Sequence, residues 1–64
     1  MNMSNKRFTL LPNQIWKYAG TERYAIIVGV DEEVIRFRML TDNDSGHINT
    51  RTINDFLLWY FFIQ

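Results

Sequence analysis

The sequence predicts a small all-β domain with one short helical turn, built as a barrel or as a strongly bent five-stranded antiparallel sheet. Three observations lead to this prediction. The chain has only 64 residues and therefore holds a single domain. Short segments rich in β-branched and aromatic residues recur at intervals of roughly 8–12 residues, which is the strand spacing of small β-sheets. Gly, Pro, Asn and Asp residues separate these segments and mark the turns between them.

The first strand is expected after a polar beginning. Residues 1–7 show no apolar pattern and are expected to form a flexible tail, so the β domain covers residues 8–64. Pro12 begins a turn signal, and the strand formers that follow predict a strand over residues 14–18. Gly20 lies in the next turn, where a glycine adopts positive φ at little cost.

Residues 24–30 and 34–40 predict a hairpin of two strands, joined by an acidic turn. The first strand is apolar on both faces, which is typical of a central strand. Gly29 within it indicates a bulge or a bend. The second strand alternates with period two, which predicts one buried and one exposed face. Its inward side chains are expected to be Ile35, Phe37 and Met39.

A polar loop over residues 41–47 precedes a weaker fourth strand over residues 48–53. The loop resembles the start of a calcium site, but Gly46 is out of register and the closing carboxylate is missing. His47 lies on the same loop, where no rigid scaffold would hold a catalytic relay. We therefore expect no enzyme activity, no cofactor and no metal.

Residues 54–63 allow two interpretations. In the first, Asn54 or Asp55 caps a helical turn over residues 56–60, and residues 61–63 form the closing strand. In the second, one continuous helix covers residues 54–63. The segment is apolar all round, so its periodicity does not choose between them.

The order of the predicted elements is marked by Gln14-Ile15-Trp16, Gly20, the hairpin of residues 24–40, Gly46 and Asp55-Phe56. This layout resembles that of small SH3-like β-barrel proteins of bacterial or phage origin, in which a short helical turn precedes the closing strand. The resemblance covers about residues 8–63. It implies the fold and assigns no ligand.

Composition excludes several classes of function. Seven basic residues balance seven acidic ones, so no overall field attracts nucleic acid or anionic lipid. The chain has no cysteine, and its three glycines are too scattered to form a phosphate-binding loop. With no export signal and no apolar run of the length that spans a bilayer, the expected location is the cytoplasm and no membrane role is expected.

The aromatic run near the C-terminus is the main functional candidate. Residues 56–63 hold five of the ten aromatic residues, and any strand or helix directs such a run to opposite sides. One side is therefore expected to contact another protein, which includes the option of a homodimer. The alternative is that the whole run is core. The predicted contact residues are Trp59, Tyr60, Phe61 and Phe62, bordered by Trp16 and Tyr18 if the first strand pairs with the last.

These features predict a small protein–protein interaction module without a small-molecule substrate. Neutral stand-alone proteins of this size are often accessory or inhibitory proteins of phages and mobile elements that act on a host protein, and we expect such a role. The alternative function is a small nucleic-acid-binding barrel that uses basic side chains and stacking rings. Its candidate residues are Arg36, Arg38, Arg51 and Lys17.

Overall fold

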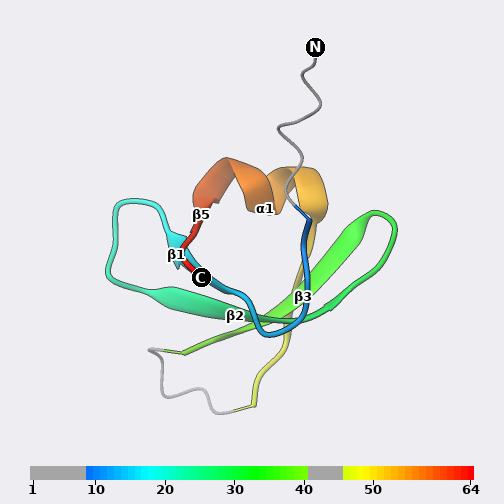
Figure 1. Cartoon of the computed structure of the whole chain (residues 1–64), viewed down its shortest axis with the longest axis horizontal. Coiled ribbons are helices and arrows are strands. Elements are labelled where there is room, and N and C mark those ends of the chain that lie inside the picture. The colour runs from blue at the N-terminus through cyan, green and yellow to red at the C-terminus, as the bar shows by residue number, and fades with distance from the viewer. Residues whose placement is uncertain (1–8, 41–45) are drawn as a thin grey trace.

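The computed structural model describes residues 9–40 and 46–64, where five strands form one antiparallel sheet in the spatial order β4-β3-β2-β1-β5 (Figure 1). The strands are β1 (Ile15–Tyr18), β2 (Tyr24–Val30), β3 (Val34–Met39), β4 (Asn49–Thr52) and β5 (Tyr60–Phe62), and the helix is α1 (Ile53–Trp59). The predicted all-β class with one short helical turn is confirmed. The predicted tail over residues 1–7 lies outside the described residues.

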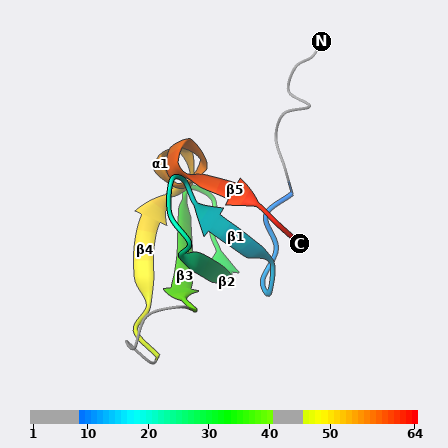
Figure 2. The same ribbon diagram turned by 90° about the vertical axis from the view of Figure 1, so that its left-hand side faces the viewer.

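The helix explains why the sheet is bent. α1 follows β4 and precedes β5 without a linker, so it joins the two edge strands directly. A helix of this length spans about 10 Å, whereas the edges of a flat five-stranded sheet lie about 19 Å apart. The sheet therefore curls toward α1, as Figure 2 shows, and it stays open because β4 and β5 are not paired with each other. The bent-sheet form of the prediction is the one observed.

β2 is the central strand, with the predicted bounds, and it contains a bulge. The register of β2 against β3 shifts between Ile27 and Gly29, so Val28 has no partner on β3. Ile27 is buried, and after the shift Val30 packs against the core. The bulge thus adds one exposed residue and returns the strand to the core side. Of the bulge or bend predicted from Gly29, the bulge is observed, with the neighbouring Val28 as the extra residue.

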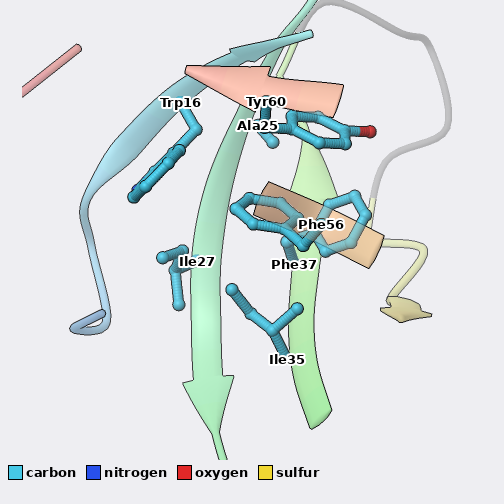
Figure 3. Packing of buried hydrophobic residues seen from close by; sticks show 7 residues of the cluster. All are labelled: Trp16, Ala25, Ile27, Ile35, Phe37, Phe56 and Tyr60. Carbon is cyan, nitrogen blue, oxygen red and sulfur yellow. The ribbon is translucent and has the colours of Figure 1, made fainter. Parts of the chain in front are cut away.

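The core is a cluster of aromatic and aliphatic side chains between the concave side of the sheet and α1 (Figure 3). Phe56 lies at its centre and stacks on Tyr60 with ring centroids 4.3 Å apart. The Phe56 ring also meets Phe37 at 5.1 Å and Trp16 at 5.3 Å. Each such pair adds about 0.5–1.5 kcal/mol beyond the apolar area it buries. The buried residues are Trp16, Ala25, Ile27, Ile35, Phe37, Phe56 and Tyr60.

The helix begins earlier than predicted. Its N-cap is Thr52, whose hydroxyl oxygen accepts a hydrogen bond from the backbone N–H of Asp55 at 3.1 Å. Asn54 and Asp55 lie within the first turn, so the prediction of either as N-cap is wrong. The reason is that β4 runs directly into α1 and leaves Thr52 with the extended backbone that a cap requires.

The helix ends at Trp59, where the chain turns into β5. Tyr60 has an extended backbone, while its N–H still donates to the carbonyl of Phe56. The interpretation as a helical turn followed by a strand is therefore confirmed in outline. The competing prediction of a helix over residues 54–63 is wrong.

The turn between β1 and β2 has the predicted glycine. Gly20 adopts a φ of 77°, which an L-residue with a side chain reaches only at a cost. Thr21 closes the turn, because its hydroxyl donates to the Tyr18 carbonyl at 2.8 Å and accepts from the Arg23 N–H at 3.0 Å. This turn directs β2 back along β1.

Candidate interaction surface

The end of α1 and the residues of β5 expose a cluster of large apolar side chains. Their exposed fractions range from 44% to 72%. Other exposed apolar side chains of the described residues, such as Leu11, Val28 and Ile48, are spread over separate segments. We call the cluster the C-terminal patch, and it consists of Leu58, Trp59, Phe61, Phe62 and Ile63.

The helical part of the patch is exposed because α1 packs against the core with one face only. Ile53, Phe56 and Leu57 contact the core at helical positions i, i+3 and i+4, which lie on one face. Leu58 and Trp59 fall outside that face and have no described element above them. Their apolar side chains therefore remain in contact with water.

The strand part of the patch is divided between the two sides of β5. Tyr60 is buried on the core side, and Phe62 is on the same side, where its ring meets Trp16 edge-on at 5.6 Å. Phe61 points to the outer side, since neighbouring side chains of a strand alternate. Ile63 continues the alternation, because its N–H still donates to a carbonyl of β1. The patch therefore wraps around an edge strand of the sheet.

Two of the six predicted contact residues are core residues. Trp16 and Tyr60 are almost fully buried, so their assignment to an exposed contact is corrected. Tyr18 is half-buried and stacks on Tyr60 with ring centroids 5.0 Å apart. The first strand does pair with the last, which was the condition for Trp16 and Tyr18 to border the contact. Sequence reasoning missed Leu58 and Ile63, although both belong to the same apolar run.

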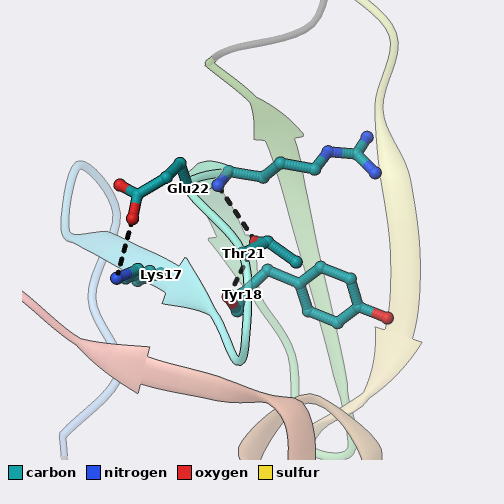
Figure 4. A network of polar contacts seen from close by, with 5 residues as sticks. Lys17, Tyr18, Thr21 and Glu22 are labelled. Atoms are coloured by element: carbon teal, nitrogen blue, oxygen red, sulfur yellow. Dashed lines mark hydrogen bonds and ion pairs between the residues drawn. The ribbon is translucent and has the colours of Figure 1, made fainter.

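The patch contains no charged side chain. Residues 56–64 include neither an acidic nor a basic side chain. The nearest basic residue in the register is Lys17, which is opposite Phe61 on β1. Its ammonium group lies 3.7 Å from a carboxylate oxygen of Glu22 (Figure 4). The chemistry of the patch therefore suits an apolar partner surface.

The basic residues proposed for nucleic acid do not all lie on one face of the sheet, because Lys17, Arg36 and Arg38 are on the outer face and Arg51 is not. Arg36 and Arg38 lie on the outer face of β3, because they alternate with the inward Ile35 and Phe37. Arg51 is opposite the buried Ile35 in the register, so it lies on the other face of the sheet. The prediction that Arg51 joins the two arginines of β3 is therefore wrong.

Three of these four basic side chains also have acidic neighbours. Arg36 donates to a carboxylate oxygen of Asp31 at 2.8 Å, and Lys17 has Glu22 as its partner. Arg51 lies 3.6 Å from Asp55 on the first turn of α1. Exposed pairs of this kind stabilise a fold little, but they neutralise the charge that would attract a phosphate backbone.

Residues 9–40 and 46–64 were compared with the requirements of a metal site and of a membrane-spanning helix. No three His, Asp or Glu side chains within these ranges are placed to hold a metal ion. The loop tested for calcium lies mostly outside the described residues. Within the same ranges, no helix is both long enough and apolar enough to span a bilayer.

Among the described residues, the C-terminal patch is the strongest functional candidate. The chain matches no protein-family model, no curated protein and no solved structure.

Proposed function

We propose that this protein is a protein–protein interaction module that binds its partner through the C-terminal patch. The observation that supports this proposal is the grouping of five large, uncharged apolar side chains at one edge of the sheet. Single exposed apolar residues are ordinary on protein surfaces. Contiguous apolar patches are instead typical of sites that contact another protein.

The size of the patch supports the same interpretation. Phe and Trp side chains bury about 150–250 Å² each, and the patch has three of them beside one leucine and one isoleucine, which are somewhat smaller. With all five about half exposed, the patch offers at most roughly 500 Å² of apolar surface. A standard interface buries about 800 Å² on each partner. The patch alone therefore supplies roughly half of one side of such an interface.

The composition of the patch fits a binding site as well. Trp59 and the two phenylalanines belong to the aromatic residues that are enriched at interfaces. Tryptophan is also enriched among the few residues that contribute most of a binding energy. Covering a partner's surface requires no catalytic group, so this mode of binding is sufficient for an accessory or inhibitory role.

A protein partner is favoured over nucleic acid. The formal net charge of the chain is zero, whereas nucleic-acid affinity depends mainly on uncompensated basic groups. Arg51 lies on the other face of the sheet from the remaining basic candidates, and three of the four have acidic neighbours.

Affinity capture tests the proposal with a matched pair of variants. Leu58→Ser removes an exposed leucine from the patch, and Leu11→Ser removes an exposed leucine elsewhere. The tagged proteins are incubated with an extract of the cells that make the protein, and the captured proteins are identified and quantified by mass spectrometry. We expect Leu58→Ser to reduce the specifically captured protein about tenfold, the effect of losing 1.4 kcal/mol.

The Leu11→Ser variant should capture as much of that protein as the unmodified chain. Thermal unfolding of both variants establishes that each is folded. Equal capture by the patch variant and the control would place binding on another surface. A folded, unmodified chain that captures no protein and does not associate with itself would reject the proposed function.

A further inference from the structure

We propose that the partner is a second copy of this chain, which packs its own C-terminal patch across the β5 edge in a two-fold symmetric dimer. This inference rests on the proposed function and names the partner of the same surface. It is supported by the charge of the patch, its area and its position on both sides of one strand.

The charge of the patch permits self-association. In a two-fold symmetric contact, a surface meets an identical surface. A patch with charged groups would bring like charges together, which opposes binding. Residues 56–64 have no charged side chain, and the whole chain has a formal net charge of zero. Two copies therefore bring no like-charged side chains of the patch together, and their zero net charges do not repel each other at long range.

The area is sufficient for a dimer. Two patches of at most roughly 500 Å² together bury up to about 1,000 Å², the level that a biological interface is expected to exceed. Further apolar area is available on the outer face of the sheet, next to Ile63. Ile15 and Ile26 are register partners on β1 and β2, and both are half-buried apolar residues of that face. The apolar surface thus continues from β5 onto its neighbours.

The position of the patch also favours a second copy. The exposed rings of Phe61 and Phe62 lie on opposite sides of β5, so a partner that covers only one side leaves the other ring in water. A two-fold axis perpendicular to the sheet at the β5 edge places the outer side of one copy beside the outer side of the other. The same axis places Leu58, Trp59 and Phe62 beside their counterparts on the helix side.

Sedimentation equilibrium from micromolar to millimolar protein tests this inference. We expect the unmodified chain to pass from the mass of a monomer to that of a dimer. Leu58→Ser and Ile63→Ser should each raise the dissociation constant about tenfold or more, as expected for apolar interface residues that contribute at least 1.4 kcal/mol. Leu11→Ser and Ile48→Ser are the matched controls, because both remove exposed aliphatic side chains outside the patch. These controls should leave the dissociation constant unchanged.

A second measurement does not depend on variants. If the folded chain dimerises, its thermal unfolding midpoint rises with protein concentration, since association stabilises the folded state by mass action. A chain that stays monomeric at millimolar concentration overturns the inference. So does a dimer that the control variants weaken as much as the patch variants do.

The two proposals fail in different ways. The chain could be monomeric and still capture another protein in a way that Leu58→Ser abolishes. That result would support the proposed function and show that the partner is not a second copy. A monomeric chain without patch-dependent capture removes both proposals.

Discussion

Replacing Phe56 with leucine should destabilise this domain by about 2–3 kcal/mol. The Phe56 ring is fully buried and contacts the rings of Trp16, Phe37 and Tyr60. Each ring pair contributes about 0.5–1.5 kcal/mol beyond burial, so the loss of three pairs has an upper limit of about 4.5 kcal/mol. Leucine keeps most of the apolar burial at the site, which places the expected loss below that limit.

The expected loss is large compared with the stability of the domain. A chain of 64 residues has a free energy of unfolding of about 3–10 kcal/mol, at 0.05–0.15 kcal/mol per residue. In a domain of this size, 1 kcal/mol shifts the unfolding midpoint by about 4–8 °C. The midpoint of Phe56→Leu should therefore fall by about 10–20 °C.

Circular dichroism during heating measures this shift at one fixed, low protein concentration, so that self-association does not contribute. Leu58→Ala is the control, because Leu58 lies two positions along the same helix and is 72% exposed. Its free energy of unfolding should change by no more than about 0.5 kcal/mol. If both variants unfold at the same temperature, the aromatic cluster around Phe56 is not the main source of stability.

Three further predictions concern the helix cap, two glycines and the arginines of β3. Thr52→Ala should lower the free energy of unfolding by about 1 kcal/mol, and Thr52→Ser should restore most of it, because the hydroxyl caps α1; urea unfolding measures both. In the same assay Gly20→Ala should lower the free energy of unfolding by about 1 kcal/mol, because the backbone at this position has a positive φ. Gly29→Ala should change the free energy of unfolding by no more than about 0.5 kcal/mol, since the new methyl group meets the movable end of the Arg36 side chain at 3.0 Å. A larger loss of stability in Gly29→Ala than in Gly20→Ala would contradict this explanation. The unmodified chain should not retard single-stranded oligonucleotides at low salt, and retardation that Arg36→Gln with Arg38→Gln abolishes would restore the nucleic-acid alternative.

The sequence by itself determined the central hairpin and the turns around it. The bounds of β2, the bulge at Gly29 and the inward direction of Ile35 and Phe37 all follow from signals that act over a few residues. Strand alternation has a period of two, and a glycine or an acidic turn interrupts it at a defined point. Such signals do not depend on the rest of the chain, so they are readable before the fold is known.

The tertiary structure alone decided how the last residues divide between core and surface. Their run is apolar all round, so the pattern does not distinguish the buried Tyr60 from the exposed Phe61. The division depends on α1 joining the two sheet edges, which places Phe56 over the sheet and leaves Leu58 exposed. The helix cap was decided in the same way, because the pairing of β4 with β3 extends to Thr52 and helical backbone begins at the next residue. In each case the physical reason is that burial and strand ends are set by neighbours that are distant in the sequence.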